Sequence, residues 1–426
     1  MELKSKIGLV FFLGTVICFI FFGKCLAIEN TLGDERMDIL AYLSGPPKYA
    51  SAERYREMAD CGFTHGLTWP ADIKTLDSML NAAEEAGVKL FINYPKIAAE
   101  PEKIAEHFRN HPALGGYYIK DEPSAELFPQ LAETVKRIQS VDSEHPCYIN
   151  LFPDYAAPQQ LGTETYQQHI DRFLAEVPVT FLSFDYYPIW DYKVRESWYE
   201  NLEIVAKASR EKGIPFWAFA NVSNHWHYPP ATTEHLRFQQ FTNLAYGAQT
   251  LQYFPYWKPS HKHWYCPIMP GGVRSETYEK VKKVNAEINA VAWVFKGSKV
   301  ISLGHTGRKN FWWPKSDGGP DAPSQEEGPI PAGTTHYESA SPVKKLVAQG
   351  QFGVIVSTLA KGNRRFLVVV NKDYANTATL EIEFDGTKDI SVVTKDGKIK
   401  KLAENNYKEL INPAQMTIFS WLDLKL

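Results

Sequence analysis

Cysteine is scarce in this sequence, with five residues in 426, two of them within the first 27 positions. The other three, Cys61, Cys147 and Cys266, lie far apart and form no C-x-x-C pair, which argues against a disulfide framework and a cysteine-based metal site. Cys61 and Cys147 stand in apolar segments, so we expect them to be buried thiols. Stability must then come from a hydrophobic core, which a chain of this length can build.

Long runs of one charge are also absent. Lysine and arginine number 46 against 49 aspartates and glutamates, so the formal net charge is only -3, and nothing indicates binding to nucleic-acid phosphates or anionic lipid. A glycine-rich phosphate loop and the H-E-x-x-H and G-x-S-x-G motifs of other hydrolases are missing as well. We therefore expect a neutral ligand, no nucleic-acid partner and no cofactor.

The chain begins with two lysines, an apolar run over residues 7–22 and small residues around Ala27. This pattern predicts an export signal over residues 1–27. Cys25 suggests a lipid-modified cysteine, although Lys24 is unfavourable directly before such a processing site. An uncleaved anchor helix stays open, because the run is nearly long enough to span a bilayer, and no other membrane contact is expected. Each alternative places the rest of the chain outside the cytoplasm, whether periplasmic, extracellular or at the cell surface.

From residue 34 to 295, short apolar segments alternate with amphipathic stretches, which is typical of βα units and a parallel sheet. Helical patterns between the segments often end at or near a glycine. Eight such units predict an α/β fold of the (β/α)8 TIM-barrel type. The predicted strands cover residues 37–44, 63–69, 88–94, 115–120, 147–152, 180–187, 215–221 and 250–257.

After residue 295 the pattern becomes β-rich without intervening helices, which predicts a small all-β C-terminal domain, an antiparallel sandwich, over residues 296–426. Residues 305–340 are rich in glycine and proline and are expected to form a long surface loop. The predicted strands cover residues 299–304, 352–359, 365–373, 377–384, 390–397 and 416–422.

In such barrels the functional groups lie where the strands end. Side chains alternate along a strand, so an apolar Ile119 facing the helices predicts that Lys120 and Glu122 point into the barrel mouth. The same alternation points Ser183 and Asp185 inward on the sixth strand. The expected polar cluster at the mouth consists of Asn93, Lys120, Asp121, Glu122, Asn150, Asp185, Tyr186 and Asn221.

Two carboxyl groups beside a cleft are what glycosidic bond cleavage requires, one to protonate the leaving oxygen and one to stabilise or attack the developing cation. Burial and mutual repulsion separate the two pKa values, so that one group is protonated beside an ionised one. A structural alternative stays open, in which Lys120 and Asp185 form an ion pair and Glu122 caps the next helix.

The loops around this mouth are rich in aromatic rings, which can stack on the apolar faces of sugars. Trp69, His225 and Trp257 are therefore expected to contact substrate, unless the rings pack mainly on one another. His225 also belongs to one of two H-x-H pairs that zinc could use in principle. Hydrogen bonding to hydroxyls is favoured, and no metal site is predicted. The remaining residues of the pairs are His227, His261 and His263.

The motifs "YIKDEP", "SFDYYP" and "AYGAQTLQYFPYW" resemble those of (β/α)8 glycoside hydrolases of the clan A type. The resemblance implies that Glu122 is the general acid/base. It also implies a nucleophilic glutamate on strand seven, but that strand reads "WAFANVSN" and contains no acid. Asp185 could replace it, as in the α-galactosidase clan, which works from strands four and six.

The consecutive Asp121 and Glu122 also resemble the pair of hexosaminidases and of β-N-acetylgalactosaminidases with a "DEP" motif. In those families the substrate's acetamido group attacks, which implies that Asp121 orients this group, Glu122 is the acid and Tyr186 contacts the acetamido group. We therefore predict an exported glycoside hydrolase acting on a carbohydrate. Two alternatives are a non-catalytic glycan-binding protein and a polysaccharide lyase with Lys120 or Tyr186 as base.

Overall fold

The computed structural model describes residues 35–195, 197–259, 261–309, 327–328 and 330–423. The predicted leader, with Cys25, and the middle of the predicted loop at 305–340 lie outside these residues. Within the described part of the chain, no helix has the length and hydropathy needed to cross a membrane. Cys61 and Cys147 are buried free thiols, as predicted, and Cys266 is a third.

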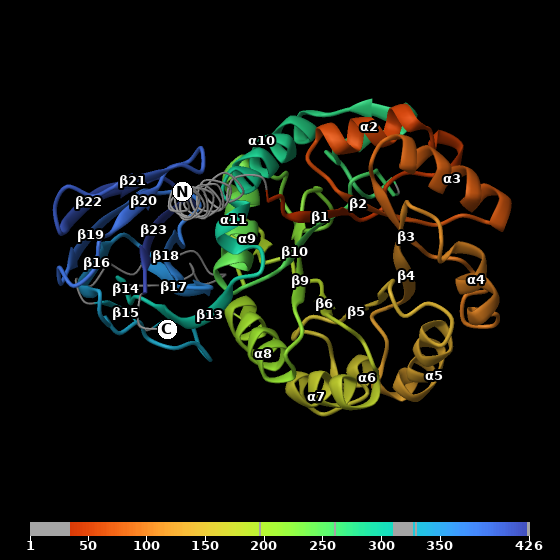
Figure 1. Ribbon diagram of the computed structural model, residues 1–426, viewed down its shortest axis with the longest axis horizontal. Coiled ribbons are helices and arrows are strands. Elements are labelled where there is room, and N and C mark those ends of the chain that lie inside the picture. Colours follow the sequence, from red (N-terminus) through yellow and green to blue (C-terminus); the bar gives the residue numbers. More distant parts are fainter. Residues whose placement is uncertain (1–34, 196, 260, 310–326, 329, 424–426) are drawn as a thin grey trace, which may run out of the picture.

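Eight parallel strands form a closed barrel in the order β1, β10, β9, β6, β5, β4, β3, β2 (Figure 1). Each strand overlaps one of the eight predicted segments, so the predicted α/β barrel is confirmed. The strands are β1 Asp38–Ala41, β2 His65–Thr68, β3 Lys89–Ile92, β4 Leu114–Asp121, β5 Cys147–Leu151, β6 Leu182–Phe184, β9 Phe216–Asn221 and β10 Thr250–Phe254.

Helices surround the barrel, and their starts follow the sequence. Asp72 caps one helix by accepting a hydrogen bond from the Thr75 backbone N–H at 2.7 Å, and Thr165 and Gln168 form a capping box at another. The helices are α2 Ala52–Asp60, α3 Ile73–Glu85, α4 Pro101–Phe108, α5 Phe128–Gln139, α6 Pro158–Leu161, α7 Tyr166–Glu176, α8 Ser197–Lys212, α9 Thr233–Ala245, α10 Glu276–Ala290 and α11 Ala292–Phe295.

The C-terminal domain is an antiparallel sandwich of a six-stranded sheet, β13-β17-β18-β23-β20-β21, and a three-stranded sheet, β16-β19-β22. Val356, Leu367, Ile382 and Phe419 are among the buried residues of its core. The sandwich is confirmed, although β16, β21 and β22 were not among the predicted strands. The bounds are β13 Lys299–His305, β16 Val343–Gln349, β17 Val354–Lys361, β18 Arg364–Asn371, β19 Ala378–Phe384, β20 Ser391–Val393, β21 Ile399–Lys401, β22 Asn406–Ile411 and β23 Met416–Leu422.

Helix α9 is covered by the barrel on one side and by β17 and β18 of the sandwich on the other (Figure 1). Several of its polar side chains are therefore buried, and some of them bond to the backbone of the barrel strands. Gln240 donates to the Gln252 backbone oxygen at 3.0 Å, and Asn243 donates to the Phe219 oxygen at 3.1 Å. These bonds fix the helix to β9 and β10.

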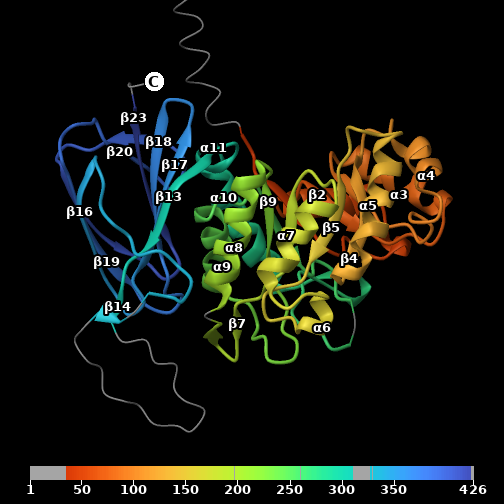
Figure 2. The same ribbon diagram turned by 90° about the horizontal axis from the view of Figure 1, so that it is seen from below.

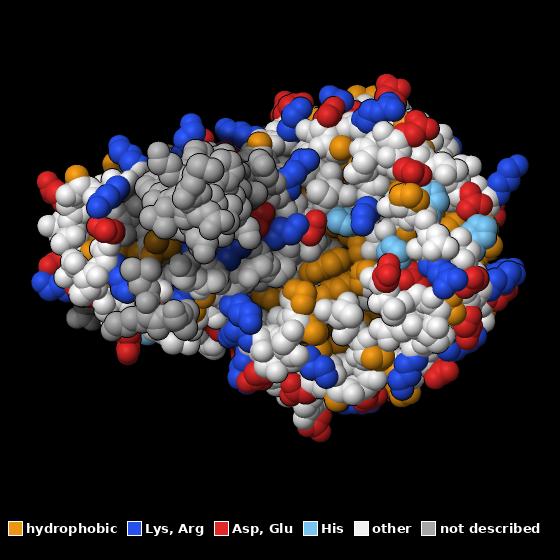
Figure 3. All heavy atoms as spheres, viewed as in Figure 1, with side chains coloured by type: hydrophobic (Ala, Val, Ile, Leu, Met, Phe, Trp, Pro, Cys, Tyr) orange, Lys and Arg blue, Asp and Glu red, His pale blue; other side chains and the backbone are white. Residues whose placement is uncertain are grey.

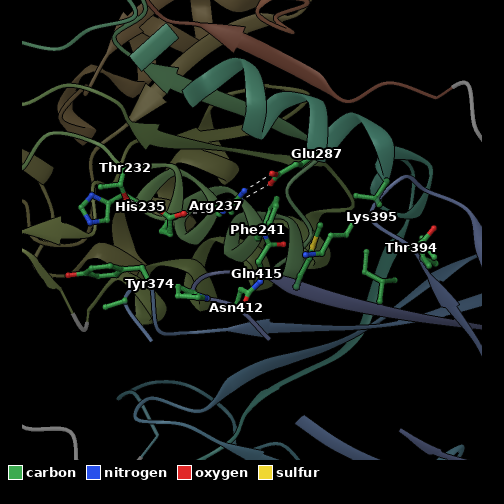
Figure 4. Close-up of a pocket in the computed structure, with 17 residues that line it drawn as sticks. Thr232, His235, Arg237, Phe241, Glu287, Tyr374, Thr394, Lys395, Asn412 and Gln415 are labelled. Atoms are coloured by element: carbon green, nitrogen blue, oxygen red, sulfur yellow. Dashed lines mark hydrogen bonds and ion pairs between the residues drawn. The ribbon is translucent and has the colours of Figure 1, made fainter. Parts of the chain in front are cut away.

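A cavity of about 770 Å³ lies at this domain junction. Figure 4 shows Arg237 of α9 paired with Glu287 of α10 on one side, and Tyr374 and Gln415 of the C-terminal domain on the other. Its lining includes no residue from the carboxyl ends of the barrel strands, so it is separate from the predicted mouth.

Charged side chains of both signs are interspersed over the face of the molecule drawn in Figure 3, and hydrophobic side chains gather at the centre of the barrel there. This agrees with the near-zero net charge. The α6 helix and the short β7, Ile189–Trp190, follow the carboxyl ends of β5 and β6, and Figure 2 shows both at the lower end of the barrel.

Candidate active site

A β-bulge in β4 decides which side chains of the "YYIKDE" segment enter the barrel. Tyr118 pairs with Tyr148 of β5, but the register then shifts, so that Lys120 pairs with Ile149 and Asp121 with Asn150. Tyr118 and Tyr148 belong to the interior ring cluster, whereas Ile149 belongs to the core between barrel and helices. A bulge inserts one residue and reverses the alternation after it.

The prediction that Lys120 points into the mouth is therefore wrong. Ile119 and Lys120 share the outer side, because Ile119 packs against the outer core and Lys120 stands opposite Ile149. Asp121, which simple alternation would direct outward, is turned to the inner side. The structural alternative, in which Lys120 pairs with Asp185, finds no support, because Lys120 stands on the outer side and forms no ion pair with Asp185 among the described residues.

Three carboxyl groups converge at the carboxyl ends of β4 and β6. Asn150 donates its amide hydrogens to Asp121 at 3.2 Å and to Asp185 at 3.0 Å, so these two acceptor oxygens are no farther apart than the 6.2 Å that the two distances span together. The carboxyl group of Glu122 lies close enough to Asp185 for its charge to raise the pKa of Asp185. Tyr42 donates to the second oxygen of Asp121 at 3.1 Å.

Burial and like charge make this cluster hold a proton near neutral pH. Burial, and then the charge of Asp121, raise the pKa of Glu122 to about 7, although its interaction with Asp185 acts in the opposite direction. The pKa of Asp185 is also raised, first by burial and then by the charges of Glu122 and Asp121. Two adjacent carboxyl groups of this kind share one proton.

The backbone at Glu122 is held in an unusual conformation. Its φ of 42° lies in the left-handed region, which costs a non-glycine residue about 1–3 kcal/mol. The Glu122 N–H donates to the Asn150 backbone oxygen at 2.8 Å, which extends the β4–β5 pairing by one residue and fixes this conformation. The half-buried side chain is thereby directed at Asp185 while part of it stays accessible to solvent.

Beneath the carboxyl groups, a buried hydrogen-bond network fills the barrel. Ser183 donates to the Asn150 side-chain oxygen at 2.9 Å, and Gln252 donates to Ser183 at 2.9 Å. Tyr148 completes the network by donating to Gln252. Because its side-chain oxygen accepts from Ser183, Asn150 is fixed with its amide nitrogen towards Asp121 and Asp185.

Tyr186 does not contribute to the mouth, which contradicts the prediction. Its ring is buried in the outer core, and its hydroxyl is 2.7 Å from Ser197 of α8. Two successive residues of an extended chain point to opposite sides, so Asp185 facing inward requires Tyr186 to face outward. Tyr187 points inward instead, into the interior ring cluster, and lies near Asp185.

Other predicted binding residues differ in accessibility. Trp69 is half-buried and packs edge-on against Tyr42, with ring centroids 5.3 Å apart. Asn93 is half-buried directly after β3. Trp257 is buried against the ring of Tyr49 and is therefore not an open platform.

Asn221 and His225 both organise the loop after β9. Asn221 accepts from the Ser223 backbone N–H at 3.2 Å, and the His225 ring lies 2.8 Å from the Ser223 hydroxyl. Burial, and then His263, lower the pKa of His225 to about 4, so its ring is neutral at neutral pH. No group of three or more histidine, cysteine or acidic side chains suited to a metal ion occurs among the described residues.

Several large rings on the strand-end loops are exposed. Trp226 is 73% exposed, Trp264 52% and Tyr265 55%. Backbone hydrogen bonds of 2.8 and 2.9 Å between Asn224 and Trp264 join the loops after β9 and β10, so these rings are presented by connected segments. Such a surface suits stacking against sugars.

Tyr42, Tyr187, Ser183 and Gln252 support the carboxyl cluster but were not among the predicted site residues. Tyr42 lies inside the first predicted strand and immediately follows the observed β1, and Tyr187 ends the sixth predicted strand, two residues after Asp185. Continuing the alternation to the ends of these predicted strands would have identified both. The sequence gives no comparable signal for Gln252, whose position depends on barrel closure.

No protein-family model matches this chain, and no curated protein matches its sequence. Among solved structures, an α-amylase from Anoxybacillus, described as giving insight into a new glycosyl hydrolase subclass, is similar with a TM-score of 0.51 and 10% identity, over 93% of this chain and 99% of that one. An α-L-arabinofuranosidase from Thermotoga maritima has a TM-score of 0.49 and 10% identity over 92% and 97%. A family 39 glycoside hydrolase from Bacteroides cellulosilyticus has a TM-score of 0.46 and 11% identity over 92% and 82%. The likeness to the amylase shows a shared fold over nearly the whole of both chains.

Proposed function

We propose that this protein is an exported glycoside hydrolase that cleaves O-glycosidic bonds of a polysaccharide or glycoconjugate, with Glu122 as the general acid/base. The observation that carries the proposal is the cluster of Glu122, Asp185 and Asp121 at the carboxyl end of the barrel, in which Asn150 donates to both aspartates and the three acids act on one another electrostatically. The amylase-like fold supports it by analogy. Export rests on the leader pattern of residues 1–27.

In the proposed reaction, the protonated Glu122 donates its proton to the oxygen of the leaving sugar while the C–O bond breaks. An ionised carboxylate on the other side of the bond stabilises or attacks the developing cation. Asp185 and Asp121 both qualify as this partner, since each lies within the same hydrogen-bonded cluster. The shared proton keeps one group acidic and the other charged near neutral pH.

Asp121 also suits the orienting role in a substrate-assisted reaction. Tyr42 and Asn150 each donate to one of its oxygens, so the carboxylate is fixed in orientation. Tyr186, the partner that the resemblance implied for an acetamido group, faces the helices, and Tyr187 takes the inward position. The lyase alternative loses support, because Lys120 and Tyr186, its two proposed bases, are both directed away from the mouth.

The test is release of reducing sugar from a broad glycan panel by the wild type, by E122Q and by E126Q. Glutamine keeps the shape of Glu122 but cannot donate the proton, so E122Q should lose at least about 100-fold in kcat. Glu126 is exposed and four residues farther along, so E126Q should match the wild type.

Full activity of E122Q would remove Glu122 from the mechanism. If the wild type binds glycans in affinity gels and cleaves none of the panel, the non-catalytic binding alternative becomes the better account.

A further inference from the structure

Arg195 lies in the loop after β6 with its guanidinium against three aromatic rings. The central carbon of the guanidinium is 4.2 Å from the ring centroid of Trp190, 4.4 Å from that of Tyr155 and 5.8 Å from that of Tyr228. The rings come from the loops after β5, β6 and β9, so the cation sits where three strand-end loops meet. It is half-buried.

Other arginines that stack on rings in this protein use their N–H groups on protein acceptors. Arg172 lies over Phe128 and donates to Glu176 at 2.8 Å. Arg274 lies over Tyr278 and donates to Glu57. For Arg195, by contrast, no side-chain hydrogen bond or ion pair to any described residue is present, and its bonds are those of its backbone, with the Pro188 oxygen and the Trp198 N–H.

This site is close to the carboxyl cluster. Tyr228 touches Tyr187 with ring centroids 5.7 Å apart, and Tyr187 lies close enough to Asp185 to be affected by its charge. Tyr228 lies between Arg195 and the carboxyl cluster, and its pKa is affected by the charges of Arg195, Asp185 and Glu122. Arg195 is therefore two rings away from the pair that would act on the glycosidic bond.

We infer that Arg195 binds the anionic group, a carboxylate or a sulfate, of a sugar next to the bond that is cleaved. Rings cover the faces of the guanidinium and leave its N–H edge free, and that edge matches two oxygens of an oxyacid. The inference rests on the proposed function and names its substrate class as acidic glycans. The low net charge describes the chain as a whole. It does not prevent a single arginine from binding an anionic group locally.

The experiment measures binding, so that it does not depend on catalysis. Full-length protein carrying E122Q is applied to a glycan array that contains uronate-bearing, sulfated and neutral oligosaccharides, and the bound members are then titrated by calorimetry. Uronate-bearing members against their methyl esters, and sulfated members against desulfated ones, distinguish the two sources of charge. We expect binding of acidic members, and at least a tenfold loss in the E122Q/R195M protein.

The matched control is R172M in the same background, because Arg172 also stacks on a ring but lies on a barrel helix; it should bind like E122Q alone. If R195M does not fold, R195K tests the same point, since lysine keeps the charge and stem but lacks the planar fork and should still weaken acidic glycans several-fold. Binding of neutral members only, no binding of any acidic member, or equal affinities with and without Arg195 would overturn the inference.

The two proposals fail in different ways. Arginine-dependent binding of acidic glycans without cleavage by the wild type would reject the proposed function and keep the inference. Cleavage of neutral glycans that depends on Glu122 and is not affected by R195M would keep the proposed function and reject the inference.

Discussion

The raised pKa of Glu122 predicts a pH-dependent cost in stability that can be measured without knowing the substrate. An acid whose pKa is higher in the folded than in the unfolded protein does not lower the free energy of unfolding at pH values below its unfolded pKa. The free energy of unfolding then falls as pH rises through the folded pKa. For Glu122 the two values are about 4.5 and about 7. Each unit of difference corresponds to about 1.4 kcal/mol, so ionisation between pH 5 and 8 costs about 2.5 kcal/mol. Partial exposure of the side chain reduces this to about 2 kcal/mol.

The variant E122Q removes this titration while keeping the size of the side chain. Urea unfolding of the wild type and of E122Q at pH 5 and pH 8 gives the effect as a difference of differences, which cancels every group common to both proteins. We expect E122Q to gain about 2 kcal/mol relative to the wild type on going from pH 5 to pH 8. The exposed-site variant E126Q should show no such gain. Parallel pH dependence of E122Q and wild type would refute a buried, proton-holding Glu122.

Two further predictions concern the pH profile of kcat on whichever glycan the panel identifies. D121N removes the charge of Asp121, the second cause of the raised Glu122 pKa, while burial remains. The alkaline limb of the kcat profile should therefore move down from about pH 7 by up to about one unit. An unmoved limb would show that the charge of Asp121 does not affect Glu122. Y187F removes the inward hydroxyl that lies near Asp185, so kcat should fall about tenfold. Y186F should leave kcat within about twofold and lower the free energy of unfolding by about 1 kcal/mol, because the Tyr186 hydroxyl bonds to Ser197 on the helix side. Equal effects on kcat in the two phenylalanine variants would contradict their opposite orientations.

The barrel was predictable because its strands are short, mainly apolar segments, largely buried and separated from one another by amphipathic helices. The strands of the C-terminal domain that escaped prediction have a different composition. The β21 strand, Ile399–Lys401, is exposed throughout, and β22, Asn406–Ile411, alternates exposed residues with half-buried or buried ones. Their place in the sheets is set by pairing with β20 and β19, and the local pattern of hydrophobic residues does not predict this pairing.

At the site, sequence reasoning identified Asp121, Glu122 and Asp185 but misplaced Lys120. The error has one physical source, since alternation is reliable only while the ladder is regular, and the bulge between Tyr118 and Lys120 interrupts it. The bulge depends on how β4 fits against β5 in the closed barrel, so it is a tertiary feature. The pairing of Glu122 with Asp185 was within reach of the sequence, because both follow strands whose carboxyl ends meet at one rim.

The distribution of backbone strain favours this rim as the functional end of the molecule, whichever sugar it accepts. Among the described residues, six of the seven non-glycine residues with positive φ lie on loops that follow barrel strands: Leu43, Glu122, Asp191, Tyr192, Trp226 and Tyr265. Such conformations cost about 1–3 kcal/mol each and persist only where the surrounding structure enforces them. The carboxyl groups with raised pKa add their own cost at the same end. The buried rings of the barrel, and helix α9 packed between the barrel and the sandwich, stabilise the fold. This stabilisation offsets the backbone strain and the cost of placing three acids together.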